Sequence, residues 1–258
     1  MQRGFSLVEL SIVLVILGLL TGGILAGQSL IKAAELRAVS TEAQRHMASF
    51  NTFRDKYFAA PGDMTNATKF WGIQGDPTPC KTTPSTTALT CDGNGDGNLS
   101  TTDGGTTYYE IFRYWQQLAN AGLLEGSYTG VTGSGAVIHD VPGINVPRSR
   151  MNNMAWGVTY SGPTYTGSTA GFALDFGNFY YAGAPMTNGT VIGKSLKPEE
   201  LWNIDTKLDD GKPANGKIIS YWWDECTDAT SNSNLTANYA LNNSTADCAI
   251  IVRKSLYN

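Results

Sequence analysis

Apolar residues fill the beginning of the chain almost without interruption. No charged residue occurs from Leu10 to Ile31. As an α-helix rising ~1.5 Å per residue, this segment would extend about 33 Å, enough to cross the hydrocarbon core of a bilayer. The pattern predicts that residues 5–31 form a membrane-spanning helix.

Beyond this segment, apolar residues recur at steps of three and four, which is the period of one helix face. Pro61-Gly62 is expected to end the helix. Residues 32–59 are therefore predicted to form the amphipathic half of the same helix and to pack under a folded head. The polar side, with Arg37, Glu42 and Arg45, is expected to face solvent or another subunit, and His46 is predicted at the surface. The apolar stripe consists of Leu36, Val39, Ala43, Met47, Phe50, Phe53 and Tyr57.

The remaining residues, 60–258, read as one head domain of short elements in a background rich in glycine and threonine. A helix is predicted within 106–126, where Thr107 and Glu110 match a capping box and Gly122 suits the helix end. Another is predicted with Pro198 in its first turn and its end at Asp209-Asp210-Gly211. Segments with aromatic and β-branched residues between turn signals predict four strands, at 154–160, 171–181, 217–223 and 249–254. A long helix followed by an antiparallel sheet is an α+β architecture.

The composition changes this picture in two respects. The net charge is −4 and only 16% of residues are charged, so no basic surface for nucleic acid is indicated. The cysteines Cys80, Cys91, Cys226 and Cys248 lack the CxxC spacing of zinc sites. Local pairing, 80–91 and 226–248, is the simplest arrangement and predicts an oxidising compartment. Free buried thiols are the alternative.

A single acid, Glu9, distinguishes the apolar segment from simpler membrane signals. A cleaved secretory signal fits Arg3 but not Glu9, and Ile24-Leu25-Ala26 is a poor match to the A-x-A-like cleavage site of such signals. A plain anchor explains the length but not the acid, because a carboxylate inside a bilayer costs ~2.5–3.5 kcal/mol and usually has a partner. A third explanation has to supply that partner.

The sequence RG followed by FSLVELSIVLVILGLL resembles the prepilin N-terminal motif of type IV pilins and type II secretion pseudopilins. The resemblance implies cleavage after Gly4 by a prepilin peptidase and methylation of the new N-terminus at Phe5. It also implies that Glu9 pairs with the N-terminal ammonium of the next subunit, an arrangement in which buried charges are tolerated. The short leader, residues 1–4, and the absence of a proline about twenty residues into the mature chain depart from the family's usual pattern.

The segment from Asp92 to Asp103, DGNGDGNLSTTD, matches the spacing of a calcium-binding EF-hand loop. Asp92, Asn94, Asp96, Asn98, Ser100 and Asp103 would supply oxygen ligands around a tight turn at Gly97. The preceding segment cannot be an entering helix, so a bare Ca²⁺ loop that stabilises the head is predicted. The alternative is an Asp- and Gly-rich turn that only binds water. The acids Asp205, Asp209 and Asp210 are more simply explained by capping and turn formation.

No catalytic constellation is present, so an enzyme is not expected. The resemblance implies the pilin fold and a structural subunit that assembles through its N-terminal helix into a helical filament, with copies of itself or other pilin-like subunits. Implied partners are prepilin peptidase, the membrane before assembly and an inner-membrane assembly platform. The precursor would lie in a bacterial inner membrane, and the product in a cell-surface filament. A type II secretion pseudopilin in a periplasm-spanning pseudopilus, a minor or adhesive subunit, and a membrane-anchored calcium-dependent binding module are the alternatives.

Overall fold

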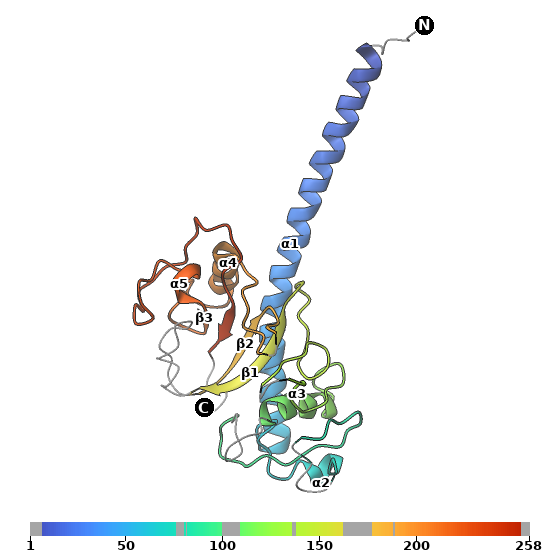
Figure 1. Ribbon diagram of the computed structural model, residues 1–258, viewed down its shortest axis with the longest axis vertical. Coiled ribbons are helices and arrows are strands. Elements are labelled where there is room, and N and C mark those ends of the chain that lie inside the picture. Colours follow the sequence, from blue (N-terminus) through green and yellow to red (C-terminus); the bar gives the residue numbers. More distant parts are fainter. Residues whose placement is uncertain are drawn as a thin grey trace.

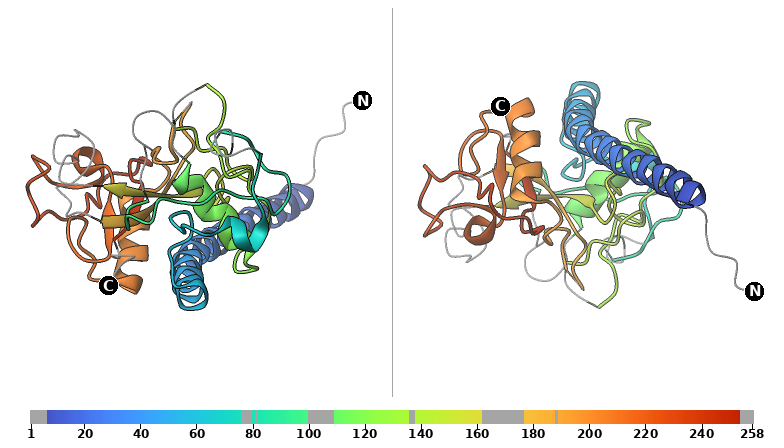
Figure 2. Two further views of the ribbon diagram at one scale, coloured as in Figure 1. Left: turned by 90° about the horizontal axis from the view of Figure 1, so that it is seen from below. Right: turned by 90° about the horizontal axis from the view of Figure 1, so that it is seen from above.

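A computed structural model describes residues 7–75, 80, 82–99, 109–135, 138–161, 177–187 and 189–253 of the chain. Its architecture is α+β and pilin-like, which confirms the predicted fold class. One long helix, α1 (Leu7–Tyr57), precedes a small antiparallel sheet with short helices around it. The N-terminal half of α1 projects away from the head, and its C-terminal half lies within the head (Figure 1). Figure 2, along the molecule's long axis, shows α1 at one side of the head with the strands beside it.

The two halves of α1 differ in what surrounds them. From Leu7 to Ile31 nearly every side chain is exposed, and the first buried residue is Leu36. Val39, Ala43, Phe50 and Phe53 then follow on one buried face. The amphipathic half therefore packs as predicted, because the period of its apolar residues places them on one stripe of the helix.

The helix ends before Pro61. Its last residue is Tyr57, and Phe58 adopts a left-handed backbone conformation with φ of 55° while its N–H still bonds to the carbonyl of Arg54. A bulky residue at positive φ is uncommon in proteins. The turn at Phe58 directs the chain into the segment that carries Pro61.

Four short strands form the sheet in the order β1-β2-β4-β3, with every neighbouring pair antiparallel. Their bounds are β1 (Ala155–Ser161), β2 (Gly177–Gly183), β3 (Ile218–Ser220) and β4 (Ile250–Val252). The central strand β4 is fully buried, as its run of Ile-Ile-Val requires. The four strands fall within or overlap the predicted segments, although 171–176 lies outside the described residues. β3 is shorter than predicted because Trp223–Cys226 forms a helical turn, α5.

Helix α3 (Glu110–Asn120) corrects the predicted capping box. It begins at Glu110 with Tyr109 at the N-cap position, so Glu110 opens the helix instead of occupying its third position, and Thr107 lies outside the described residues. Its end agrees with the prediction: Gly122 has φ of 73°, and the N–H of Leu123 bonds to the carbonyl of Leu118.

Helix α4 follows its sequence signal, whereas the short helix α2 had none. Helix α4 (Pro198–Leu208) starts at the predicted proline, and the side chain of Glu200 accepts a bond from the N–H of Lys197. It packs beside α1. The short α2 (Thr68–Trp71) lies near the C-terminal end of α1 and was not predicted (Figure 1).

Two polar side chains of α1 are not at the solvent-facing surface expected for them. His46 is 4% exposed, among the rings of Trp115, Trp156 and Tyr180. Glu42 accepts bonds from Ser149 Oγ at 2.6 Å, from the Arg150 N–H at 2.8 Å and from Trp156 Nε1 at 2.9 Å. The Glu42 prediction was wrong because the 147–156 segment crosses the polar edge of α1. The His46 prediction was wrong because rings from α3, β1 and β2 pack around it.

Candidate functional site

The first candidate site is the N-terminal half of α1. Among the described residues, α1 is the one helix long and apolar enough to cross a membrane, and its apolar window is unburied. Glu9 lies in its first turn and is exposed. Gly4 and Phe5 lie outside the described residues. A carboxylate in the first turn is favoured by the helix macrodipole, so the local fold tolerates Glu9 where the bilayer would not.

This half of α1 has a clear chemical consequence. Apolar side chains cover the helix all round, and within one described chain nothing packs against them. A helix with apolar residues on all faces is stable only in lipid or among other apolar helices. The segment can therefore anchor the chain in a membrane or associate with copies of itself.

The second candidate site is the predicted calcium loop, of which residues 92–99 are described. Asn94 and Asp96 lie together: Asn94 Nδ2 donates to Asp96 Oδ2 at 3.0 Å, and the Asp96 N–H donates to Asn94 Oδ1. The Asn98 N–H bonds to Asp96 Oδ1, and Gly97 has φ of 84°, as the tight turn requires. Ser100 and Asp103 lie outside the described residues.

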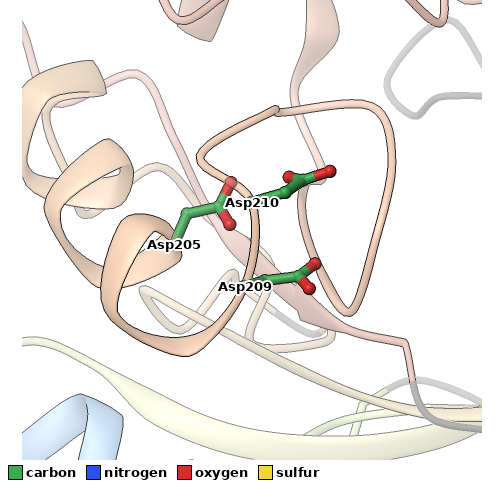
Figure 3. A group of neighbouring side chains, drawn as sticks. All are labelled: Asp205, Asp209 and Asp210. Atoms are coloured by element: carbon green, nitrogen blue, oxygen red, sulfur yellow. The ribbon is translucent and has the colours of Figure 1, made fainter.

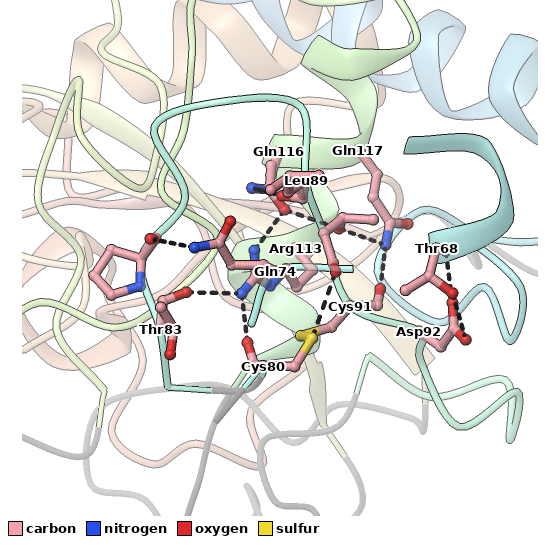
Figure 4. The surroundings of a disulfide bond; sticks show 12 residues. Thr68, Gln74, Cys80, Thr83, Leu89, Cys91, Asp92, Arg113, Gln116 and Gln117 are labelled. Carbon is pink, nitrogen blue, oxygen red and sulfur yellow. Dashed lines mark hydrogen bonds between the residues drawn. A yellow bond between two sulfur atoms is a disulfide. The ribbon is translucent and has the colours of Figure 1, made fainter. Parts of the chain in front are cut away.

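Asp92 points elsewhere. Its Oδ1 accepts the N–H of Thr68 at 2.7 Å and its Oδ2 accepts Thr68 Oγ1 at 3.0 Å, at the start of α2 (Figure 4). The described carboxylates of this loop are therefore not gathered around one point. The donor atoms suit a hard cation, while both oxygens of Asp92 accept hydrogen bonds from Thr68.

Two acidic side chains from outside the loop accept hydrogen bonds from its backbone, and neither was predicted from the sequence. Asp63 accepts the N–H groups of Gly95 at 2.7 Å and Gly97 at 3.1 Å, and Glu110 accepts the Asn94 N–H at 3.0 Å. Both side chains are buried. A side chain at position 93 would collide with the backbone of Asp63, so the glycine there allows this approach. Because Asp63 and Glu110 lie outside the loop segment, no local sequence pattern links them to it.

The resulting negative field has a measurable effect on a neighbour. The pKa of Tyr109 is raised, first by burial and then by the charges of Glu110, Asp63, Asp96 and Asp92. Four carboxylates thus surround one phenol. A cation in this loop would reduce their mutual repulsion.

A third acidic group, Asp205, Asp209 and Asp210, brings its oxygens within 4.8 Å of one another (Figure 3). Asp205 accepts bonds from the Gly211 N–H and from Tyr239 Oη, and burial raises its pKa. Asp209 accepts the N–H of Lys217 and Asp210 that of Lys212. These bonds close the turn after α4, which agrees with the explanation by capping and turn formation.

Two disulfides, Cys80–Cys91 and Cys226–Cys248, join the locally paired cysteines, as predicted. The loop closed by the first is held from inside by α3 (Figure 4). Arg113 Nη2 donates to the Cys80 carbonyl at 2.7 Å and Gln117 Nε2 to the Cys91 carbonyl at 3.1 Å. Burial lowers the pKa of Arg113 to about 10, so the guanidinium remains charged at neutral pH.

The comparisons with known proteins concern only the N-terminal segment. The family model described as the prokaryotic N-terminal methylation motif matches residues 1–25. Comparison with curated proteins and with solved structures gives no significant match. The motif points to a structural subunit processed by prepilin peptidase and anchored in the membrane as a precursor, and not to an enzyme. Residues 1–25 thus carry the signature of type IV pilins and pseudopilins. The fold of the chain is α+β and pilin-like.

Proposed function

We propose that this chain is a structural subunit of a type IV pilus-like filament. It is cleaved after Gly4, methylated at Phe5 and polymerised through α1, with Glu9 pairing with the N-terminus of a neighbouring subunit. The observation that carries the proposal is the methylation motif placed on a helix that is apolar on all faces and free of the head over its N-terminal half. Burial of that half among neighbours supplies the driving force for assembly.

Two alternatives share part of this support. A type II secretion pseudopilin has the same N-terminal features and would assemble in the periplasm. A permanently anchored binding module would use the apolar half of α1 as a membrane span only. Mature filaments observed on the cell surface would distinguish a pilin from a pseudopilin and from an anchored binding module.

The first experiment is the mass of the N-terminal peptide of the native protein. We expect a peptide that begins at Phe5 and carries one added methyl group. The same preparation examined by electron microscopy should contain filaments that react with an antibody against the head. An unmodified chain starting at Met1 would contradict the proposal and favour the anchored module.

We also propose that the 92–103 loop binds Ca²⁺ and that the ion stabilises the head. Support comes from the spacing of Asp92, Asn94 and Asp96 and from the entry of Asp63 and Glu110 into the same loop. Loops of this kind in extracellular modules bind at ~10⁻⁴–10⁻³ M. The ion would offset the repulsion among these acids, of which Asp63 and Glu110 are buried.

Added Ca²⁺ should therefore raise the melting temperature of the full chain in detergent. At 5 mM Ca²⁺ and a Kd of ~10⁻⁴ M, mass action stabilises the folded state by about 2 kcal/mol, which corresponds to roughly 5 °C for a domain of this size. Asp96→Ala should abolish the shift measured by calorimetry. Asp210→Ala is the matched control and should retain it. An unchanged melt of the parent chain, or a shift lost only with Asp210→Ala, would rule out the 92–103 loop as the site.

A further inference from the structure

A groove lies where α1 leaves the head, between the helix and the loops around residues 124–128 and 147–150 (Figure 1). Its volume is about 570 Å³, within the range of ligand-binding clefts. We call it the arginine groove. Its α1 wall begins with apolar side chains, most of them small: Leu30, Ala33, Ala34 and Ala38. A wall of this kind leaves room for an apolar chain that runs along the helix.

The rim of the arginine groove has a surplus of positive charge. Four arginines and two glutamates line the groove: Arg37, Arg45, Arg148, Arg150, Glu42 and Glu125. Both oxygens of Glu42 already accept hydrogen bonds from the 149–156 segment, and Glu125 Oε1 lies 3.9 Å from Arg45 Nη2. Within the described residues, no carboxylate forms an ion pair with Arg37, Arg148 or Arg150. All three side chains are exposed, so their guanidinium groups can receive an anion.

Two further acids at this end of the head contact Lys32 and are not among the residues that line the groove. Lys32 Nζ lies 3.0 Å from Glu200 Oε1 and 3.9 Å from Glu35 Oε2. The other oxygen of Glu200 accepts the N–H of Lys197 at the start of α4. These acids are therefore engaged on the side of α4, and the arginines of the groove keep their charge.

The position of the groove along α1 places its mouth at a membrane surface. The uncharged run of α1 ends at Ile31, and Arg37 follows six residues later, roughly 9 Å along the helix at ~1.5 Å per residue. The headgroup layer of one leaflet is about 5–7.5 Å thick. Side chains of a helix lean toward its N-terminus, so Arg37 reaches back toward this layer. The mouth of the groove is thus level with the lipid phosphates when the apolar half of α1 spans a bilayer.

These properties together select a lipid as the occupant. The apolar wall is continuous with the membrane-spanning half of α1 through Leu30, so an acyl chain can follow it without leaving the bilayer. Guanidinium groups bind phosphate through paired, charge-assisted hydrogen bonds. An anionic phospholipid offers both groups in one molecule, and the membrane supplies it at the mouth of the groove. A zwitterionic lipid carries its own cation and gains less from the arginines.

We propose that the arginine groove binds one anionic phospholipid from the membrane in which α1 is anchored. The phosphate lies among Arg37, Arg148 and Arg150, and an acyl chain runs along Leu30 and Ala34 into the bilayer. The site belongs to the membrane-anchored chain and does not depend on assembly into a filament. It attaches the head to the membrane surface by a contact separate from the span itself.

The first test counts the lipids that stay on the full chain in a non-ionic detergent, by native mass spectrometry. Phosphatidylglycerol should remain bound at one molecule per chain. Phosphatidylcholine with the same acyl chains, and inorganic phosphate at the same concentration, should not. The double variant Arg37→Gln, Arg148→Gln should bind phosphatidylglycerol about thirtyfold more weakly, because each arginine near an anionic lipid contributes roughly fivefold.

The control is the double variant Arg54→Gln, Lys56→Gln. It removes two positive charges from the same helix, about 25 Å beyond Arg37, and should bind phosphatidylglycerol like the parent. A second readout separates binding from folding. Without lipid, the groove variant should melt within about 2 °C of the parent, because exposed and unpaired arginines contribute little to stability. With phosphatidylglycerol, the parent should melt at a higher temperature, and the groove variant should lack this increase.

Three outcomes would overturn the proposal. Equal retention of the two lipids, or equal weakening in both double variants, would mean adsorption without a site. Retention of inorganic phosphate would identify an anion site that needs no lipid. A chain that keeps no lipid but forms a dimer, which the groove variant loses, would assign the groove to a second copy. None of these results bears on cleavage at Gly4 or on filaments, which the N-terminal peptide mass and microscopy test separately.

Discussion

Replacing Glu9 by glutamine should leave the chain processed at Gly4 but largely abolish its assembly. The substitution keeps the size of the side chain and one acceptor oxygen, and removes the negative charge. In the proposed filament that charge faces a neighbour's N-terminal ammonium in an apolar surrounding. Removing one partner of a buried ion pair costs ~3–5 kcal/mol, which corresponds to a loss of at least about a hundredfold in association. The yield of sheared filaments per cell, relative to total chain, measures the effect.

The control for this experiment is Glu35→Gln. Glu35 lies on the same helix, beyond its apolar half. It is half-buried, and its Oε2 lies 3.9 Å from Lys32 Nζ. A pair of this kind contributes little, so filament yield should stay close to that of the parent. The N-terminal peptide mass is needed for both variants. Normal assembly of Glu9→Gln would contradict the pairing, and an uncleaved Glu9→Gln chain would place the residue in recognition by the peptidase instead.

The parts of the fold that were predictable are those with a local cause. An uncharged apolar run from Leu10 to Ile31 can only be a helix in lipid or among helices, and the stripe after Leu36 has helical period. Pro198 and Gly122 mark helix ends through their own backbone preferences. The N-terminal motif is similarly contiguous, so the sequence alone led to the family that the motif comparison supports.

Local patterns did not predict what distant segments bring together. His46 falls on the spacing Val39, Ala43, His46, Phe50 and was nevertheless expected at the surface because of its polarity. That spacing was the signal that could have corrected the prediction. Asp63 and Glu110 reach the acidic loop from 32 and 16 residues away, and no motif links them to it.

The buried polar residues of α3 likewise depend on contacts with a distant segment that local patterns do not predict. The helix is buried on all sides from Glu110 to Leu118, its polar residues included. Burial of Arg113, Gln116 and Gln117 is possible because the loop closed by Cys80–Cys91 presents carbonyl oxygens to them. Buried polar groups need such partners, and these partners come from a loop that has no regular period of its own.

Lowering the pH from 6.5 toward 3 should destabilise the head through His46. Burial, and secondarily the charge of Arg45, lowers the pKa of His46 to about 3 in the folded chain, whereas the ordinary value is 6.5. Below pH 6.5 the unfolded chain therefore binds a proton that the folded chain does not. Each pH unit in this window removes about 1.4 kcal/mol from the free energy of unfolding, and the full window removes about 5 kcal/mol.

Two buried acids oppose this trend, so the test has to be a difference between variants. Burial raises the pKa of Asp140 to about 6 and that of Asp205 to about 7. Folded chains thus bind these protons more tightly, and both groups add stability as the pH falls. Both are present in the parent and in His46→Phe, and their contributions cancel in the difference between these two.

His46→Phe should remove the acid-sensitive contribution while filling the space among Trp115, Trp156 and Tyr180. Its free energy of unfolding, measured by urea titration of the full chain in detergent, should fall less steeply than that of the parent between pH 6.5 and pH 4. The difference should grow to about 3 kcal/mol at the lower end. His139→Phe is the matched control, because the chain has only two histidines and His139 is half-exposed. It should not reproduce the shallower slope of His46→Phe, since it changes only the charge beside Asp140, whose pKa the imidazole lowers. Equal slopes for the parent and His46→Phe would show that His46 is protonated in the folded head.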